Sequence, residues 1–333
     1  MDLDARLTVL GSLNMDISVT VPSLPGPGAT VLGGPAAFAP GGKGANQAVA
    51  AARLGTEAGV AVRMIGCVGD DDFGRALRAA LTADGIDDRG VRTVPGAPTG
   101  IAMITVDETG ENIITVAPGA NHEVGAPEIS VIRESAAAAS SGSANVLVIS
   151  AEVPVPAILA ALAATGTESR AVLNLAPAPP HEEAAGILKA RPDWLVVNES
   201  EAAALLARPV SGLAEAASAA ADLVAAGARN AVVTAGAAGA AYHGTRGNGE
   251  GQAPRGTVAA FPVRAVDTVG AGDTFVGALA VALAAGIPPA EAVTAAAAAG
   301  AAAATRPGTQ AGMPRPADIR AATGYEWPLS VIK

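Results

Sequence analysis

Short runs of valine, isoleucine and leucine recur along this chain between alanine-rich segments. The runs span residues 7–10, 146–149, 171–175, 195–197 and 231–234. Continuous apolar runs of this length are typical of strands that are buried on both faces, and alternation with helices is typical of parallel sheets. The sequence therefore predicts an α/β fold with a mostly parallel central sheet and helices on both of its faces.

Two regions rich in proline and turn residues interrupt this alternation. Residues 17–40 contain several prolines, and residues 100–116 form two apolar segments around the turn Asp107-Glu108-Thr109-Gly110. Both patterns are typical of short strands, so we expect a small separate β-sheet. A lid over a ligand site and an edge extension or dimer contact fit this pattern equally well. The predicted division assigns residues 1–13, 41–95 and 120–333 to the α/β domain, and residues 14–40 and 96–119 to the small sheet.

Composition limits the classes of partner. The chain has 333 residues, half of them apolar, and a formal charge of −10. Nucleic acids and anionic membranes need a basic face, so neither is expected as the main partner. Residues 295–304 form the longest apolar stretch, about half of the ~20 residues that cross a bilayer, and we expect a buried helix there. The lone Cys67 and the absence of targeting-peptide character at the acidic N-terminus predict a cytoplasmic protein.

Polar and glycine-rich residues follow the first apolar run. In the segment Gly11-Ser12-Leu13-Asn14-Met15-Asp16, the two-residue period of a strand places Asn14 and Asp16 on one face and Met15 on the other. Such a pair suits neighbouring sugar hydroxyls, and it equally suits a strand end with turn-forming residues.

Residues 41–47 then open a helix, with Lys43 and Asn46 on one side of its first turn. Ala37 and Gly44 stand where a Walker A loop needs glycine and a hydroxyl residue, so this is not a nucleotide P-loop. The glycines permit close approach of a ligand, and a purely structural turn remains the alternative.

Two later strand ends carry similar segments. Asn198 and Glu201 fit a helix N-cap with its capping-box partner, and they also fit a water-mediated Mg²⁺ site. Residues 234–239 join two strands, where exposed backbone and the Thr234 hydroxyl are suited to approach a nucleotide, although many β-turns look similar. No Gly-x-Gly-x-x-Gly follows the first strand, which argues against a nicotinamide-dependent dehydrogenase.

Residues 267–275, Asp-Thr-Val-Gly-Ala-Gly-Asp-Thr-Phe, form the most informative segment. They make a glycine-flanked turn that leads into an apolar helix. Free N–H groups of Gly270, Ala271 and Gly272, together with the helix dipole, would stabilise charge on a transferred phosphoryl group. Asp273 lies in the first helical turn, where it is suited to accept a proton from an attacking hydroxyl. The alternative is that this aspartate only stabilises the helix start.

Taken in order, these segments resemble the ribokinase (PfkB) family of carbohydrate kinases, from about Leu7 to about Pro314. The resemblance rests on Gly-Ser-Leu-Asn-Met-Asp, Gly-Gly-Lys-Gly-Ala-Asn-Gln-Ala-Val-Ala-Ala, Asn-Glu-Ser-Glu and Asp-Thr-Val-Gly-Ala-Gly-Asp-Thr-Phe. It implies a three-layer αβα fold with a small β-sheet lid, a homodimer formed through that sheet, and ATP-dependent phosphorylation of a pentose. The implied reaction converts D-ribose to D-ribose 5-phosphate by in-line transfer, with Asp273 as the base.

The resemblance also implies the ligand contacts, which fall into three groups. The sugar would contact Asn14, Met15, Asp16, Gly42, Lys43, Gly44, Ala45, Asn46, Glu152 and Asp273. ATP would contact Asn198, Thr234, Ala235, Gly236, Ala237, Ala238, Gly239, Gly272 and Asp273, with Glu201 near Mg²⁺ through water. A monovalent cation, typically K⁺, would lie by Asp267, Val269, Ala303, Arg306, Gly308 and Gly312, mostly at backbone carbonyls.

Two positions depart from the family pattern, and the substrate stays open. Gly312 stands where the family often has serine, and Ala297 where a polar residue near the adenine is common. Relatives phosphorylate deoxyribose, fructose or adenosine, and a catalytically silent sugar-binding regulator is a further alternative. The ionised, acceptor-only Asp16 suits two neighbouring hydroxyl donors, which favours ribose over 2-deoxyribose.

Overall fold

The computed structural model describes residues 7–137, 145–166, 169–245 and 253–329. The predicted α/β domain also includes residues 1–6, 138–144, 167–168, 246–252 and 330–333, which lie outside the described residues.

A nine-stranded sheet forms the centre of the molecule, in the order β13-β12-β11-β10-β9-β8-β1-β4-β5. All neighbouring strands from β5 to β11 are parallel, whereas β12 and β13 are antiparallel to their neighbours. The strands are β1 (Leu7–Leu10), β4 (Val62–Gly69), β5 (Asp87–Val94), β8 (Asn145–Ser150), β9 (Ser169–Asn174), β10 (Trp194–Asn198), β11 (Asn230–Thr234), β12 (Gly239–Gly244) and β13 (Arg255–Ala259).

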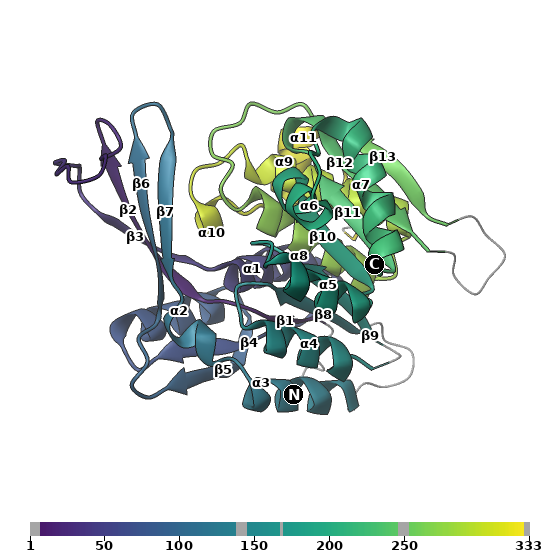
Figure 1. Cartoon of the computed structure of the whole chain (residues 1–333), viewed down its shortest axis with the longest axis horizontal. Helices are drawn as coiled ribbons and strands as arrows, with labels where there is room; N and C mark the ends of the chain where they lie inside the picture. The colour runs from purple at the N-terminus through teal and green to yellow at the C-terminus, as the bar shows by residue number, and fades with distance from the viewer. Residues whose placement is uncertain (1–6, 138–144, 167–168, 246–252, 330–333) are drawn as a thin grey trace.

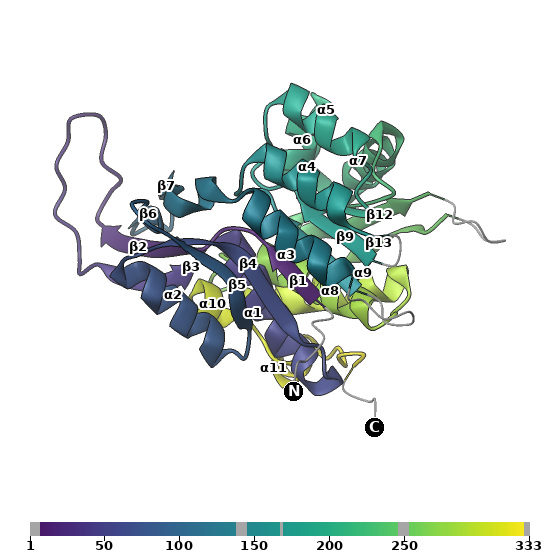
Figure 2. The ribbon, with the colours of Figure 1, turned by 90° about the horizontal axis from the view of Figure 1, so that it is seen from below.

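Helices cover both faces of this sheet, so the molecule has three layers (Figures 1 and 2). One face packs against α1 (Lys43–Gly55), α2 (Asp72–Ala83), α8 (Ala271–Ala284), α9 (Pro289–Ala303) and α11 (Pro316–Thr323). The other face packs against α3 (Ala126–Ala137), α4 (Val155–Ala164), α5 (His181–Lys189), α6 (Glu199–Leu206) and α7 (Gly212–Ala226). Short helical segments are η1 (Thr56–Ala58), η2 (Gly119–Glu123), η3 (Gly236–Ala238) and α10 (Thr309–Gly312).

The strand sequences explain the two cores. In β8, Val146 and Val148 face the α1/α8 layer, while Leu147 and Ile149 face the α3/α4 layer, as the two-residue period of a strand requires. Helix α8 is buried at every residue from Asp273 to Ala284, which fits its nearly uniform apolar sequence. The predicted mostly parallel α/β fold is therefore confirmed.

A second sheet of four strands, in the order β3-β2-β6-β7, stands beside the main body (Figure 1). Its strands are β2 (Asn14–Val21), β3 (Ala37–Gly41), β6 (Gly100–Asp107) and β7 (Asn112–Ala117). The predicted hairpin around Asp107 to Gly110 is present as the β6–β7 connection. Asn14 and Asp16 were expected at the end of the first strand, but β1 ends at Leu10 and they begin β2 in the second sheet.

Candidate active site

Five parallel strands end at one edge of the large sheet, and most of the predicted site residues lie there. The carboxyl ends of parallel strands meet at the same edge, where open α/β sheets bind their ligands. The residues at or just after these ends are Ser12 (β1), Glu152 (β8), Asn174 (β9), Asn198 (β10) and Thr234 (β11).

Asp16 points from β2 across the backbone of β3. A Cβ atom built on Gly41 would overlap the Asp16 carboxylate, so this position must lack a side chain. Burial raises the pKa of Asp16 to about 7, and the charges of Glu152 and Asp273 add to this effect. Asp16 therefore shares one space with two carboxylates that come from the large sheet and from α8.

Asn14 has an orientation that a second asparagine fixes. Asn121 Nδ2 donates to Asn14 Oδ1 at 2.8 Å, while Asn121 Oδ1 accepts from the Leu13 N–H at 2.9 Å. Since Asn14 Oδ1 is an acceptor in this pair, its own NH₂ group remains as a donor. Within the described residues no hydrogen bond engages that NH₂ group. Asn121 lies in η2 and was not predicted from the sequence.

Glu152 joins the first strand end to the start of α1. Its Oε2 accepts from Ser12 Oγ at 2.6 Å and from the Lys43 backbone N–H at 3.2 Å. An acidic side chain at a helix N-terminus is favoured by the dipole and by the free N–H groups there. Gly42 precedes this start with a φ of 88°, which favours glycine. Gly44 and Ala45 are buried beneath it.

Asp273 lies in the first turn of α8, opposite the first turn of α1. Its Oδ2 accepts from Asn46 Nδ2 at 2.9 Å, and its Oδ1 accepts from Gln47 Nε2 at 3.0 Å. The side chain of Asp273 is thus held by two amides of α1. The charge of Asp273 is the main cause that raises the pKa of Lys43, with Glu152 and Glu201 contributing. The structure therefore brings Asp16, Lys43, Glu152 and Asp273 together.

Asn198 and Glu201 form the capping box that the sequence allowed. Asn198 Oδ1 accepts from the Glu201 N–H and Glu201 Oε2 accepts from the Asn198 N–H, both at 2.8 Å. Burial raises the pKa of Glu201, and its charge acts on Lys43. The capping role is confirmed, and the carboxylate also faces the space that Lys43 occupies. The Mg²⁺ role stays a prediction.

Residues 234–239 form a compact connection between β11 and β12. Ala235 N–H donates to the Gly239 carbonyl at 2.7 Å, and η3 (Gly236–Ala238) fills the turn between them. Gly239 has a φ of 115°, and a Cβ atom there would overlap the Val258 carbonyl. These contacts explain Gly239 structurally. Nucleotide contact by Thr234, Ala237 and their neighbours stays a prediction.

The two loops predicted to bind a monovalent cation are joined by one carboxylate. Asp267 Oδ1 accepts from the Val269 N–H at 3.0 Å, and its Oδ2 accepts from the Gly308 N–H at 2.9 Å. Ala303 O accepts from the Arg306 N–H at 3.1 Å. A Cβ atom on Gly312 would lie 3.0 Å from the Arg306 carbonyl oxygen. The predicted residues are therefore neighbours, with the Asp267 side chain already engaged.

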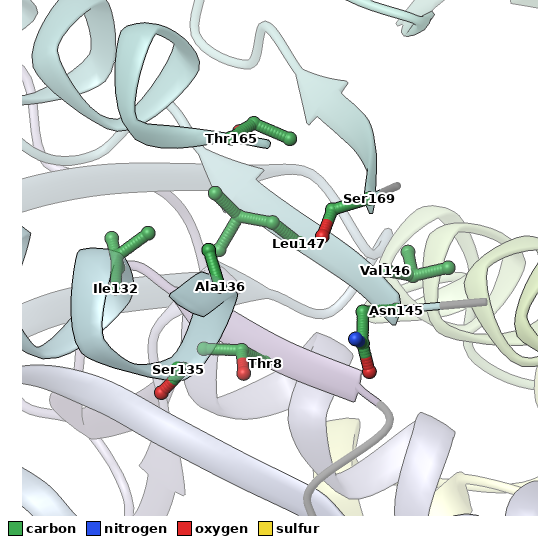
Figure 3. A pocket seen from close by; sticks show the side chains of 9 residues that line it. All are labelled: Thr8, Ile132, Ser135, Ala136, Asn145, Val146, Leu147, Thr165 and Ser169. Carbon is green, nitrogen blue, oxygen red and sulfur yellow. The ribbon is translucent and has the colours of Figure 1, made fainter. Parts of the chain in front are cut away.

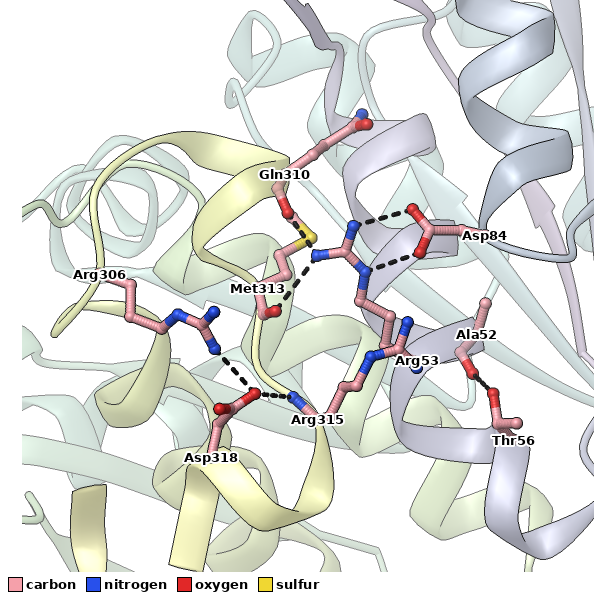
Figure 4. A network of polar contacts seen from close by, with 9 residues as sticks. All are labelled: Ala52, Arg53, Thr56, Asp84, Arg306, Gln310, Met313, Arg315 and Asp318. Carbon is pink, nitrogen blue, oxygen red and sulfur yellow. Dashed lines mark hydrogen bonds and ion pairs between the residues drawn. The ribbon is translucent and has the colours of Figure 1, made fainter. Parts of the chain in front are cut away.

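Arginine side chains hold the second of these loops in place (Figure 4). Arg53 binds Asp84 through two nitrogens and donates from Nη1 to the carbonyls of Gln310 and Met313. Arg306 forms an ion pair with Asp318 at 2.7 Å. The Arg306 side chain is thus engaged with Asp318.

One detail of the predicted anion hole is wrong. Ala271 N–H was expected to be free, but it donates to the Thr268 carbonyl at 3.2 Å, a bond that tightens the first turn of α8. Among the described residues the backbone N–H groups of Gly270 and Gly272 have no such partner. Gly270 has a φ of 79° at the N-cap, so the chain reverses there and leaves these two donors at the helix start.

A separate cavity lies at the opposite edge of the sheet (Figure 3). It is lined by Thr8, Asn145, Leu147 and Ser169 near the amino ends of their strands and by Ile132 and Ser135 of α3. None of the predicted site residues lines it. This cavity is therefore distinct from the carboxyl-edge site.

Two general searches of the described residues complete the description. No group of three or more His, Cys, Asp or Glu side chains among them is arranged to hold a metal ion. Likewise, none of the helices in the described part of the chain is both long and apolar enough to cross a membrane.

Comparison with known proteins identifies the family. The family model of the pfkB family carbohydrate kinases matches residues 4–316. The chain is 38% identical to a ribokinase of Schizosaccharomyces pombe over 317 residues, which cover 93% of this chain and 95% of the relative. It is 34% identical to a deoxyribokinase of Salmonella typhi over 274 residues, which cover 82% and 84% of the two chains.

Solved structures agree with this assignment. The crystal structure of ribokinase from Thermotoga maritima has a TM-score of 0.80 and 32% identity, and covers 95% of this chain and 98% of the other. Arabidopsis thaliana ribokinase complexed with ribose and ATP has a TM-score of 0.80 and 26% identity, and covers 97% and 99%. The chain belongs to the pfkB family of carbohydrate kinases.

Proposed function

We propose that this carbohydrate kinase transfers the γ-phosphoryl group of ATP to the 5-hydroxyl of D-ribose. The observation that carries the proposal is the group formed by Asp16, Lys43 and Asp273 at the carboxyl edge of the sheet, where the charge of Asp273 acts on both of the other side chains. Similarity to ribokinases, one of them solved with ribose and ATP, supports this pair of substrates.

Asp273 serves as the base in this proposal. It accepts the proton of the 5-hydroxyl as the oxygen bonds to the γ-phosphorus, in line with the P–O bond to ADP that breaks. The N–H groups of Gly270 and Gly272 and the N-terminus of α8 stabilise the charge on the transferred group. Ala271 contributes less, since its N–H is engaged with Thr268.

Sugar selectivity would come from a fixed donor next to a fixed acceptor. Asn14 offers its NH₂ group, because Asn121 occupies its oxygen, and ionised Asp16 offers only acceptors. Lys43, Asn46 and Glu152 complete the polar surroundings. A sugar that lacks one of the hydroxyls would leave a buried group unpaired, at a cost of about 1–3 kcal/mol. Ribose would thus be preferred over 2-deoxyribose without excluding it.

ATP would lie along α6 and the β11–β12 turn, with its γ-phosphate toward Lys43. Asn198 and residues 234–239 are the proposed contacts. Glu201 fits Mg²⁺, because its capping bond uses Oε2 only and Mg²⁺ otherwise takes waters and phosphate oxygens. Bound Mg²⁺ would neutralise phosphate charge.

The residues between Asp267 and Gly312 fit K⁺, because this ion takes backbone carbonyl oxygens in proteins. The Asp267 carboxylate already joins the two loops at Gly308. The carbonyls of Asp267, Val269 and Arg306 accept no backbone hydrogen bond from the described loops, which leaves them available as ligands. Bound K⁺ would add positive charge near the start of α8.

The four-stranded sheet is proposed as a lid and as a dimer contact. Asn14 and Asp16 begin β2, so movement of this sheet would carry sugar contacts with it. Five of its large apolar side chains are about half exposed, namely Phe38, Met103, Ile113, Ile114 and Val116. A second copy of the chain would cover those that share one face, Phe38, Met103 and Ile113. A cytoplasmic location is proposed because the one cysteine, Cys67, is a buried free thiol.

A panel of sugars and nucleosides, assayed with ATP, Mg²⁺ and either K⁺ or Na⁺ in a coupled ADP-release assay, tests the substrate. We expect ribose to have the highest kcat/KM and 2-deoxyribose to be lower by about tenfold to a hundredfold, the equivalent of one lost buried hydrogen bond. Turnover of a nucleoside without turnover of ribose would overturn the substrate. Ribose binding in calorimetry without ADP release would favour the silent regulator.

Replacement of the base tests the mechanism. Asp273→Asn is expected to lower kcat by at least about 10², the usual contribution of a general base, while ribose still binds. Calorimetric ribose affinity serves as the control for folding of the site. Near-normal turnover by this variant would remove Asp273 from the role of base.

A further inference from the structure

Gln47 is a buried glutamine on α1 whose side chain joins two elements of the site. It is fully buried, and its Nε2 donates to Asn174 Oδ1 at 2.9 Å and to Asp273 Oδ1 at 3.0 Å. Both hydrogens of the NH₂ group are therefore used, and the side chain has no access to the ligand space. Gln47 can affect chemistry only through Asp273.

A backbone carbonyl fixes the orientation of these amides. Asn174 Nδ2 donates to the Val196 carbonyl of β10 at 3.1 Å, and a carbonyl oxygen can only accept. Asn174 must therefore turn Oδ1 toward Gln47, and Gln47 must turn Nε2 toward both Asn174 and Asp273. The reverse orientation would set the Gln47 oxygen against two acceptors. The Val196 carbonyl of β10 thus fixes Asn174, and through Asn174 it fixes Gln47 with its NH₂ group toward Asp273 Oδ1.

The second oxygen of Asp273 is held from the other side in the same way. Asn46 Nδ2 donates to Asp273 Oδ2 at 2.9 Å, and Gln310 Nε2 of α10 donates to Asn46 Oδ1 at 3.0 Å. The carboxylate consequently has one amide on each oxygen, each braced by a further residue. Its plane is fixed relative to α1 and to the large sheet.

Gln47 keeps this geometry at a cost to the fold. Its Oε1 is buried and has no hydrogen-bond partner within the described residues. An unpaired buried acceptor costs about 1–3 kcal/mol. The two bonds of Nε2, to the buried acceptors Asn174 Oδ1 and Asp273 Oδ1, offset that cost, so the glutamine serves as a donor at this position.

The Asp273 carboxylate is attracted to the Lys43 ammonium group, and the hydrogen bond from Gln47 opposes movement toward it. The Asp273 charge is the main cause of the raised pKa of Lys43, so the two side chains attract each other. The ion pairs found in the described part of the chain nevertheless do not join them. Without the amide on Oδ1, the carboxylate would be free to turn toward the ammonium group and away from the attacking hydroxyl.

We infer that Gln47 is a positioning residue, braced by Asn174, that holds the Asp273 carboxylate in the orientation needed to accept the substrate proton. The inference rests on the proposed function, because it assumes that Asp273 is the base. Gln47 itself would contact no substrate, because it is fully buried behind Asp273.

The test compares Gln47→Met with the unchanged chain. Methionine keeps the volume and the unbranched shape but has no donor. We expect kcat with ribose to fall by about tenfold to a hundredfold, while the KM values for ribose and ATP change by less than about threefold, since the positioning of a reacting group is lost and not its binding. A normal kcat in a folded Gln47→Met protein overturns the inference.

A double-mutant cycle separates positioning from a general loss of structure. In the Asp273→Asn background, Gln47→Met should change the residual kcat by less than about twofold, because its effect passes through the missing carboxylate. Full additivity of the two losses overturns the inference. If Gln47→Met does not fold, Asn174→Leu, which removes only the brace, must lower kcat with unchanged KM values for the inference to stand.

The matched control is Ser150→Ala. Ser150 Oγ is also a buried polar atom without a partner, at the end of β8, and it has no contact with Asp273. This variant should keep wild-type kcat. The proposed function has its own test: it fails if Asp273→Asn retains activity or if the unchanged chain does not phosphorylate ribose. The inference alone fails if Asp273→Asn loses activity while Gln47→Met keeps wild-type kcat.

Discussion

Ionisation of the Asp16 carboxyl lowers the stability of the fold but is proposed to favour sugar binding. Burial, together with the charges of Glu152 and Asp273, raises its pKa from 3.8 to about 7. Between these two values the folded state keeps a proton that the unfolded state has lost, so the free energy of unfolding falls as the pH rises. Above pH 7 the full cost of ionising the buried Asp16 carboxyl is subtracted from the free energy of unfolding. The ionised form, which suits the sugar, is the less stable form of the fold.

Asp16→Asn should therefore stabilise the protein at high pH and weaken sugar binding. At pH 8 we expect the free energy of unfolding to rise by roughly 1–3 kcal/mol, because a buried charge is removed. At pH 5, about a third of the way from 3.8 to 7, the gain should be about a third as large. Denaturation curves at both pH values check this, and an equal gain at pH 5 would contradict the assigned cause.

The KM for ribose should follow the same proton in the unchanged chain. A sugar that needs ionised Asp16 finds less of it as the pH falls through the pKa of about 7. We expect KM to rise roughly fivefold to tenfold between pH 7.5 and pH 6. Steady-state kinetics with ribose over this range measure the change. A flat profile would mean that protonated Asp16 binds ribose equally well.

Cys67 lies at the centre of β4 and is fully buried. Burial raises the pKa of its thiol to about 12, and the thiolate is the reactive form. A disulfide reagent at pH 8 should leave the native protein unmodified and should label one thiol per chain after denaturation. Rapid labelling of the native protein would show that β4 opens locally.

At this scale the sequence predicts residues whose own chemistry suits a ligand better than residues that orient other side chains. Motifs lead to Asp16, Lys43 and Asp273, because a charged side chain beside glycines indicates a possible site on its own. Gln47 and Asn121 depend on partners that lie 226 and 107 positions away in the sequence. Only the folded chain joins such pairs, so neither role could be inferred beforehand.

The contact between α1 and α8 sets the distance between Asp273 and the amides of Asn46 and Gln47. A Cβ atom on Gly277 would lie 2.7 Å from the Gln47 carbonyl oxygen and 2.8 Å from the Ala50 Cβ. Gly277→Ala should therefore push the helices apart, destabilise the protein by about 1–3 kcal/mol and lower kcat. Urea denaturation and steady-state kinetics measure the two effects.

Gly186→Ala on α5 provides the comparison for that variant. A Cβ atom there would meet nothing within 4 Å. Alanine in a helix interior should stabilise by about 0.5–1 kcal/mol and leave kcat unchanged. If both substitutions had the same sign, helix propensity and not the helix contact would explain the Gly277 result.

Strands and helices were predictable where their sequences follow the expected pattern. The apolar runs predicted β1, β8, β9, β10 and β11 because these strands are buried on both faces. β5 (Asp87–Val94) was not predicted, since it is a charged edge strand without an apolar run. The end of β1 was also predicted wrongly. The predicted domain division separates residues 13 and 14, but Asn14 and Asp16 were expected at the end of the first strand, because both segments favour strand.

At the scale of the whole molecule, the four-stranded sheet exposes apolar side chains on one face that no described part of the chain covers. Met103 and Ile113 lie on that face and are 52% and 49% exposed. If a second copy covers them, Met103→Glu with Ile113→Glu should convert a dimer into a monomer, because charges would be buried at the interface. Light scattering after size exclusion measures the mass.

Thr257→Glu on β13, an exposed strand at the edge of the large sheet, is the matched control and should leave the mass unchanged. A monomeric unchanged chain would refute the dimer. At this scale the sequence predicted the two sheets and the site at the strand ends. It could not predict which surface stays exposed, because burial depends on the complete packing.

The hydrogen bond between Gln310 and Asn46 spans 264 positions of the sequence. During synthesis, Asn46 emerges early and waits for a partner that is made near the end of translation. A chain that ends before Gln310 would contain every described strand of the large sheet but would lack the donor that orients Asn46 beside Asp273.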